Sequence, residues 1–297
     1  MRSRFMSAAL KRKTKKNFTV GPIDFPRTRK TMEEQNAGRK HSQYVCVEQI
    51  DADGVKGEWQ VPQGTPKSKI IYYMHGGGFT IGSPDSHRVM TAAFAEMSGV
   101  PVFSLDYRLA PEHKFPSQLD DALTAYRWLL AGGLSPEDIM LAGDSAGGGL
   151  VLSLLHKLKS LGEVLPKAAV LFSPWTDLTL SGNSIQENKK SCSMLNDLIL
   201  ESCTDAYLDG EDPNNILASP LLGDLAGFPP LLVYASSSEA LLDDSRRLAE
   251  KAKKADVDVK LNVWQKQPHA WQIFYPFIPE AKRCLLEAAE FVKQRLS

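Results

Sequence analysis

A serine flanked by glycines is the first feature whose chemistry can be read from the sequence. Residues 142–149 read AGDSAGGG, so Ser145 lies in a G-x-S-x-G pattern. This pattern is typical of a sharp strand-to-helix turn that exposes a serine hydroxyl for nucleophilic attack. Because glycine and serine are common residues, the pattern by itself does not distinguish a nucleophile from a flexible glycine turn.

The residues on either side of the serine supply the setting that a nucleophile requires. An apolar stretch at 138–144 predicts a buried strand that ends at Ser145, and leucines at helical spacing predict a helix over 146–161. A side chain at Gly143 or Gly147 would collide where the chain turns so tightly. The N-terminus of the predicted helix also favours developing negative charge. Strand, turn and helix together favour Ser145 as a nucleophile.

A second glycine-rich motif, HGGGF at 75–79, follows a predicted strand at 69–75. Consecutive glycines leave backbone N–H groups unshielded, and acyl transfer needs such donors where a tetrahedral oxyanion forms. A phosphate-binding loop would instead show a G-K-[ST] or a G-x-G-x-x-G pattern, and the sequence contains neither. The motif therefore favours acyl transfer.

With these motifs the chain resembles the hormone-sensitive-lipase family of α/β-hydrolases, in particular its bacterial carboxylesterases with an HGGG loop and a GDSAGG elbow. The stretches DYRLAPEHKFP at 106–116 and ASPLLGDLAGFPPLLV at 218–233 extend the resemblance. It implies an eight-stranded, mostly parallel sheet with helices on both faces and a helical cap. It also implies that the oxyanion donors are the backbone N–H groups of Gly77, Gly78 and Ala146.

Among six histidines, His269 is the predicted general base. Triad residues of this fold follow the chain order serine, acid, histidine. Four histidines precede Ser145, and His156 lies within the predicted elbow helix, too close to fold back. His269 follows a predicted strand at 258–264, in the position where the catalytic histidine of the family lies.

The acid is less clearly marked in the sequence. Where the family usually presents an aspartate after the strand at 231–237, this chain reads SEALLDD, and Glu239 takes that place. Either carboxylate can orient a histidine. Asp243 and Asp244 are alternatives, although their position also suits the first turn of a helix. We favour Glu239, because it leaves the strand end directly.

These residues predict a serine carboxylesterase for small to medium-chain esters, acting through an acyl-enzyme without metal or organic cofactor. The same triad would serve an amidase or a thioesterase. A non-catalytic ligand-binding protein on this fold is a further alternative, disfavoured because all three triad positions are occupied. Candidate walls of the substrate pocket are Phe79, Trp175, Leu195, Trp271 and Phe274.

The elements that must position these residues alternate along the chain. Strands are predicted at 43–50, 69–75, 101–107, 138–145, 168–174, 231–237 and 258–264, and helices near 87–98, 117–131, 146–161, 195–208, 241–255 and 279–295. This alternation predicts a mostly parallel sheet covered by helices on both faces. The early strands at 43–61 would form an antiparallel edge.

Two segments fall outside the alternation and are predicted to form a cap. Residues 1–40 precede the first strand, and residues 176–218 separate two strands by far more than an ordinary loop. The predicted organisation is an N-terminal cap segment at 1–40, hydrolase core at 41–175, a cap insertion at 176–218 and core again at 219–297.

Charge and composition limit the partners. The formal net charge of the 297 residues is zero, yet residues 1–30 carry ten Lys or Arg against one acid. We interpret this arm as a solvated helix face, because no aromatic interleaving accompanies it that would suggest nucleic acid. The expected partner is a small ester, and the resemblance adds a homodimer through the sheet edge.

Targeting and metal signals are also missing from the sequence. No stretch approaches the ~18 apolar residues of a membrane span, and no apolar signal segment follows the first basic residues. A cytoplasmic location without stable membrane insertion is therefore expected. The four cysteines are scattered without a C-x-x-C pair, so neither a zinc site nor a disulfide framework is expected.

Overall fold

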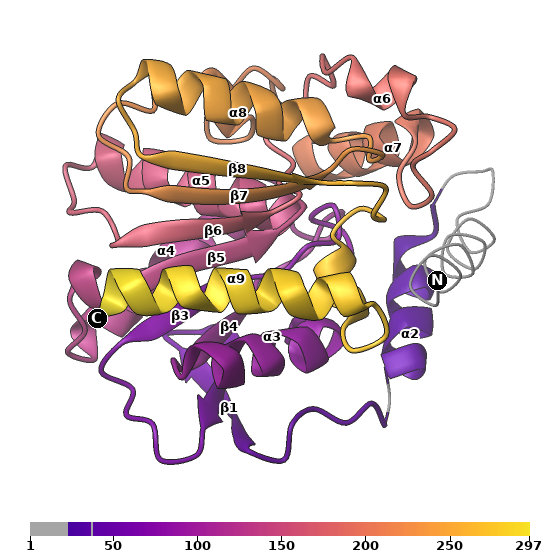
Figure 1. The fold of residues 1–297 in the computed structure, drawn as a ribbon. Coiled ribbons are helices and arrows are strands. Elements are labelled where there is room, and N and C mark those ends of the chain that lie inside the picture. The colour runs from indigo at the N-terminus through magenta and orange to yellow at the C-terminus, as the bar shows by residue number, and fades with distance from the viewer. Residues whose placement is uncertain (1–22, 37) are drawn as a thin grey trace.

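An eight-stranded sheet runs through the centre of the protein in the order β1-β2-β4-β3-β5-β6-β7-β8 (Figure 1). The computed structural model describes residues 23–36 and 38–297, so most of the basic arm predicted to be a solvated helix lies outside the described residues. The strands are β1 (Val45–Ala52), β2 (Val55–Pro62), β3 (Ile70–Met74), β4 (Val102–Asp106), β5 (Ile139–Asp144), β6 (Ala168–Phe172), β7 (Leu231–Ser236) and β8 (Val259–Trp264).

Only β2 runs against the other strands of the sheet. It pairs antiparallel with both β1 and β4, whereas the neighbouring strands from β4 to β8 all pair in parallel. Asp53 and Gly54, both with positive φ, join β1 to β2 in a two-residue hairpin turn. The predicted fold, with its antiparallel edge, is confirmed.

Helices cover both faces of the sheet. The α-helices are α2 (Phe25–Asn36), α3 (Pro84–Ser98), α4 (Ser117–Ala131), α5 (Ala146–Ser160), α6 (Ser184–Glu187), α7 (Asp197–Leu208), α8 (Leu242–Lys254) and α9 (Pro279–Leu296). Figure 1 shows α3 and α9 together in front of the sheet. Within β3, Tyr72 belongs to the core cluster that contains α4, α5 and α8, whereas Ile71 and Tyr73 belong to the cluster under α3 and α9. The alternation follows the two-residue period of a strand.

Helix α3 begins three residues before its predicted start. Ser83 caps it, because its side chain accepts a hydrogen bond from the Ser86 backbone while the Ser86 side chain reaches back to the backbone of Ser83. Pro84 occupies the first helical position, where its missing N–H costs nothing. The sequence SPDS is a helix start that apolar periodicity does not detect.

Segments from the predicted cap lie at one end of the sheet. Figure 1 shows α2 in indigo and α6 and α7 in salmon at the same end of the strands. Both groups contact the glycine-rich loop after β3, because α2 supplies Arg29, which donates to the Thr80 carbonyl, and α7 supplies Tyr207, which stacks on Phe79. The division into cap and core stays a prediction.

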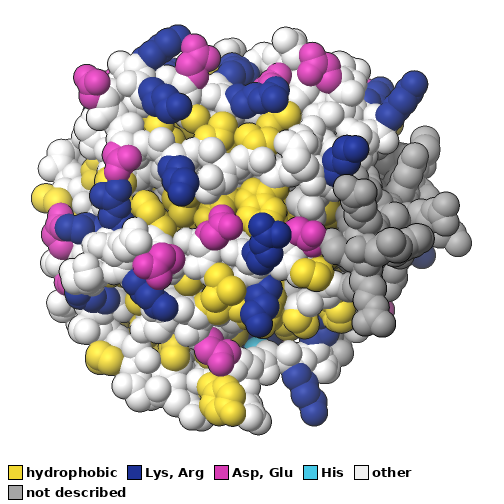
Figure 2. Space-filling view, viewed as in Figure 1, with side chains coloured by type: hydrophobic (Ala, Val, Ile, Leu, Met, Phe, Trp, Pro, Cys, Tyr) yellow, Lys and Arg dark blue, Asp and Glu magenta, His cyan; other side chains and the backbone are white. Residues whose placement is uncertain are grey.

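The surface is mixed in character. Figure 2 shows basic and acidic side chains interspersed, with apolar groups between them, on the face that carries α3 and α9. Within residues 23–36 and 38–297, no helix combines the length and the apolar character that crossing a bilayer requires.

Candidate active site

Ser145 lies on a strained turn between β5 and α5. Its backbone has φ 50° and ψ −121°, a region that non-glycine residues rarely adopt and that costs on the order of 1–3 kcal/mol. The surroundings hold this conformation: the N–H of Ser145 donates to the Phe172 carbonyl at 2.9 Å, and its carbonyl accepts from Gly149 at 3.1 Å and from Trp175 at 2.9 Å. The serine is thus fixed at the carboxyl end of the strand.

The glycines beside the serine are required by close packing against β3. A Cβ on Gly147 would lie 2.1 Å from the Met74 carbonyl oxygen, and one on Gly143 would lie 2.6 Å from the backbone of Gly147. Real Cβ atoms do not approach other atoms so closely, so any larger residue would displace the turn from β3. The G-x-S-x-G spacing has this steric cause.

His269 lies between the serine and a carboxylate. Its Nε2 is 2.8 Å from Ser145 Oγ, and its Nδ1 is 2.5 Å from Glu239 Oε2. All three side chains are buried, and Glu239 is fully so. Because a carboxylate only accepts, Nδ1 carries the hydrogen and Nε2 presents a lone pair to the serine hydroxyl. The arrangement can take a proton from Ser145.

Two further serines hold the carboxylate in place. Glu239 Oε1 accepts the Ser236 N–H at 2.6 Å and the Ser173 hydroxyl at 3.0 Å. Ser173 Oγ in turn accepts the N–H of Ala270, the residue after the histidine, at 3.2 Å. Sequence analysis missed both serines, because nothing in the pattern around 173 or 236 marks them.

The alternative acids lie elsewhere. Asp243 accepts the Ser184 N–H at 2.9 Å, and Asp244 Oδ2 accepts the N–H groups of Thr176 at 2.7 Å and Asp177 at 3.0 Å. Burial raises the pKa of Asp244 to about 7, against the lowering effect of the Thr176 N–H. Neither aspartate has a hydrogen bond to His269 among the described residues. Of the three candidates, the structure brings only Glu239 to that histidine.

The glycine-rich loop after β3 is hydrogen-bonded to Asp144, the residue before Ser145. The Gly76 N–H donates to Asp144 Oδ1 at 2.9 Å. Gly77 and Gly78 have φ of 119° and 61°, and their N–H groups have no acceptor among the described residues. Ala146 is the first residue of α5, where an N–H has no partner within the helix. These three N–H groups are therefore available to a ligand.

His75 supports this loop as a neutral ring. It is fully buried and stacks on Tyr107 at 4.2 Å, and its Nδ1 lies 2.8 Å from the Gly76 carbonyl, to which it donates. Its Nε2 has no partner among the described residues. Burial, reinforced by the neighbouring His87, lowers the pKa of His75 to about 3.

Acid therefore destabilises the fold through His75. The ring takes a proton near pH 6.5 in the unfolded chain but only near pH 3 in the folded one. The unfolded state binds more protons between these values, so stability present above pH 6.5 is lost as the pH falls. The expected loss is about 2 kcal/mol at pH 5. Urea unfolding at pH 8 and at pH 5 gives the free energy of unfolding at each pH. Its decrease from pH 8 to pH 5 should be smaller in His75→Gln than in the wild type by about 2 kcal/mol. Equal drops in both proteins would contradict the assignment.

The predicted pocket walls separate into two groups. The ring centroids of Phe79 and Trp175 lie 6.2 Å apart. Both residues, together with the partly buried Leu195, belong to the core cluster that also contains helix α5. Trp271 and Phe274 instead belong to the cluster under α3 and α9, where Trp271 is fully buried. Their assignment as pocket walls is not retained, because they pack on the other face of the sheet.

Helix α7 contacts the glycine-rich loop through two residues that sequence analysis did not name. Tyr207 stacks on Phe79 at 3.9 Å, and a Cβ on Gly78 would lie 2.7 Å from Cys203 Sγ. Both residues lie on one side of the predicted helix at 195–208, the only signal that could have found them. Within the described residues no group of three or more His, Cys, Asp or Glu could hold a metal ion.

Comparison with known proteins gives consistent matches. Residues 71–273 match a family model described as the alpha/beta hydrolase fold. The chain is 41% identical to an acetyl-hydrolase of Streptomyces hygroscopicus over 80% of this chain and 79% of that one, and 38% identical to an esterase of Acinetobacter venetianus over 83% and 82%. A crystal structure of an esterase from the bacterial hormone-sensitive lipase family superposes with a TM-score of 0.94, at 39% identity and 98% coverage of both chains.

Proposed function

Since the chain belongs to the hormone-sensitive-lipase family of α/β-hydrolases and is a carboxylic ester hydrolase, we propose that it works through a triad of Ser145, Glu239 and His269. The observation that carries the proposal is the hydrogen-bonded line from Ser145 Oγ through both ring nitrogens of His269 to Glu239. A nucleophile, a base and an orienting carboxylate in this order are the requirement for acyl transfer by serine.

The mechanism follows from the placement of each atom. His269 Nε2 takes the proton of Ser145 as Oγ attacks the ester carbonyl carbon, and the carbonyl oxygen becomes an oxyanion. The tetrahedral intermediate collapses as Nε2 protonates the leaving alcohol, which leaves an acyl-serine. Water then repeats the sequence, releasing the acid and the free serine. Glu239 holds the imidazole in the required tautomer and stabilises the imidazolium.

The oxyanion is proposed to bind the N–H groups of Gly77, Gly78 and Ala146. Such donors stabilise charge that develops only in the transition state, and each contributes on the order of 3–4 kcal/mol. The positive φ values of both glycines support this role, because they turn two successive N–H groups without obstruction by a side chain.

Alanine at either loop glycine is expected to lower kcat by at least about 10²-fold. A Cβ on Gly77 would lie 2.1 Å from the Ile81 carbonyl oxygen, so the loop must move. Gly64→Ala is the matched control: Gly64 also has a positive φ, of 76°, but no atom lies within 4 Å of its added Cβ. Steady-state kinetics should show the loss in Gly77→Ala and Gly78→Ala only. A loss of similar size in Gly64→Ala would contradict the oxyanion role.

The substrates are proposed to be esters with small to medium acyl chains. A cap formed by residues 1–40 and 176–218, set over the core at 41–175 and 219–297, would close the pocket. Phe79, Trp175 and Leu195 are retained as its walls, and the aromatic stack of Phe79 on Tyr207 limits its depth. Each methylene that the pocket buries adds up to about 0.8 kcal/mol until a wall is reached.

A substrate series tests this reading. p-Nitrophenyl esters from acetate to laurate should show kcat/KM that rises through the short chains and falls at least about tenfold for the longest, once the pocket is filled. The matching p-nitroanilide should react at least about 10²-fold more slowly than the ester, because the amine leaves less readily. A higher kcat/KM for the anilide, or for a thioester of the same acyl group, would assign an amidase or thioesterase instead.

A further inference from the structure

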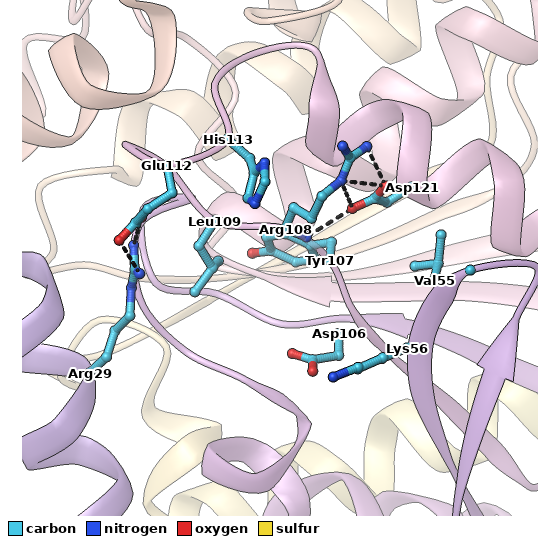
Figure 3. A pocket seen from close by; sticks show the side chains of 11 residues that line it. Arg29, Val55, Lys56, Asp106, Tyr107, Arg108, Leu109, Glu112, His113 and Asp121 are labelled. Atoms are coloured by element: carbon cyan, nitrogen blue, oxygen red, sulfur yellow. Dashed lines mark hydrogen bonds and ion pairs between the residues drawn. The ribbon is translucent and has the colours of Figure 1, made fainter.

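Arg29 of α2 makes an unusual set of contacts with the glycine-rich loop. Its Nε donates to the Thr80 carbonyl at 2.7 Å and its Nη2 donates to the Ala110 carbonyl at 2.6 Å. The guanidinium also forms a two-pronged ion pair with Glu112, at 2.9 and 2.7 Å, which Figure 3 shows beside the cavity that both residues line. Only 21% of the Arg29 side chain is exposed. An arginine side chain that points from a helix into solvent would lack these contacts with the protein.

A chain of hydrogen bonds runs from this guanidinium into the loop. The carbonyl of Thr80 accepts from Arg29, and the N–H of the same peptide unit, on Ile81, donates to the Gly77 carbonyl at 3.0 Å. That carbonyl belongs in turn to the peptide unit whose N–H is on Gly78. In a trans peptide the C=O and N–H point in opposite directions. A hydrogen bond that fixes the direction of the Gly77 carbonyl therefore also fixes the direction of the Gly78 N–H, which points the opposite way.

The positive charge of Arg29 affects the donor strength of the Gly78 N–H at the other end of this series of hydrogen bonds. A cation that donates to a carbonyl draws electron density from the peptide unit, so the N–H of that unit becomes a stronger donor. Two peptide units in series pass the polarisation from the guanidinium toward the Gly78 N–H, which accordingly binds a negative oxygen more strongly. A neutral donor in place of Arg29 would aim the loop in the same way but polarise it less.

A second path fixes the same loop from the side. The Ala110 N–H donates to the Phe79 carbonyl at 2.9 Å, and the Ala110 carbonyl accepts from Arg29. The fork of a guanidinium can serve both carbonyls and Glu112 together, which a lysine ammonium at the end of a flexible stem does not reproduce. The Arg29 side chain thus connects α2 to two backbone segments, at Thr80 and at Ala110, that support the loop with the proposed oxyanion donors.

We propose that Arg29 is a positioning residue for the oxyanion: it aims and polarises the Gly78 N–H through the peptide units of Thr80–Ile81 and Gly77–Gly78. This rests on the proposed function, in which that N–H binds the oxyanion. The N-terminal helix α2 then contributes to transition-state stabilisation, in addition to covering the end of the sheet.

Kinetics of three Arg29 variants test the proposal. Arg29→Ala should lower kcat by at least about tenfold, because displaced donors bind the transition state poorly, with KM changed less than about threefold. Arg29→Gln, which retains one neutral donor, should fall between wild type and Arg29→Ala. Arg29→Lys, which keeps the charge without the fork, should also be impaired, and it carries the test if Arg29→Ala does not fold. A kcat for Arg29→Ala and Arg29→Lys within about threefold of wild type would overturn the proposal.

A control variant separates positioning from general effects of charge. Lys30→Ala removes an exposed cation from the same helix α2. It should keep kcat within about threefold of wild type, because a solvated surface charge contributes little. A tenfold loss in Lys30→Ala would overturn the specific role of the Arg29 guanidinium.

A trifluoromethyl ketone with a short acyl chain supplies a readout that packing alone would not move. It adds to the serine as a tetrahedral oxyanion, so its inhibition constant should weaken in Arg29→Ala by the same factor as kcat/KM. An unchanged inhibition constant would overturn the proposal. Ser145→Ala is measured in parallel: full activity in that variant would refute the proposed function itself, whereas an active-site serine with an unaffected Arg29→Ala refutes only this inference.

Discussion

Replacing Ser145 with alanine is expected to lower kcat for ester hydrolysis by at least about 10⁴-fold, because no other group supplies the attacking oxygen. The variant should retain the fold, since the backbone bonds that hold the elbow come from the N–H and C=O of residue 145. Steady-state kinetics with p-nitrophenyl acetate measure kcat, and circular dichroism on the same samples measures whether the fold is retained.

Ser153→Ala is the matched control for this result. Ser153 lies in the same helix α5, is also buried, and donates from Oγ to the Gly149 carbonyl at 3.1 Å. Its loss should affect stability slightly and kcat by less than about threefold, because the hydroxyl takes no part in the proposed proton path. Comparable activity in Ser145→Ala and Ser153→Ala would show that the nucleophile lies elsewhere.

Replacing Glu239 with glutamine is expected to lower kcat by about 10³- to 10⁴-fold at neutral pH. Glutamine has nearly the shape of glutamate, but it can no longer stabilise the imidazolium of His269, and its amide can hold the ring in the wrong tautomer. Glu239→Asp should lose less, because the charge remains while the contact with Nδ1 lengthens by about one methylene. The same kinetics, with KM determined for each variant, give the comparison.

Asp243→Asn is the control that discriminates between the acids. Asp243 accepts the Ser184 N–H at the start of α6 and lies near Arg246, away from the histidine. Its kcat should stay within about threefold of wild type, although the variant loses some stability with the capping interaction. A loss of 10³-fold in Asp243→Asn together with an active Glu239→Gln would move the acid to position 243.

Most of the fold could be predicted from the sequence because its signals are local. The buried parallel strands appear as continuous apolar runs, and the two glycine motifs lie directly after β3 and β5. Ser145 and His269 could be named because chain order and the pattern of the elbow restrict the choice. These residues could be identified because local sequence and chain order reflect the physical requirements of their positions.

The supporting contacts could not be predicted, because they join residues far apart in the chain. Ser173 bonds to Glu239 from 66 positions away, and Arg29 reaches Thr80 from 51 positions away. A serine after a strand and an arginine in a basic helix carry no local mark of such a partner. These positions are determined only once the sheet order brings the strand ends together.

The pocket walls show how one residue can reverse a prediction. His269 faces the serine, yet Trp271, two positions later, packs in the cluster under α3 and α9. Between them Ala270 adopts φ 45° and ψ 46°, a left-handed conformation that alanine seldom takes and that redirects the chain. Because nothing in the sequence indicates this turn, the side of the sheet on which Trp271 packs could not be predicted.

The most direct test of the central claim is covalent labelling of the folded protein with a fluorophosphonate ester, followed by peptide mass spectrometry. An activated serine attacks phosphorus and displaces fluoride, so we expect one adduct per chain, on the peptide that contains Ser145. Labelling should disappear in Ser145→Ala and slow markedly in Glu239→Gln, while Asp243→Asn labels at the wild-type rate. A folded protein that leaves Ser145 unmodified, or carries the adduct on another serine, would contradict the account.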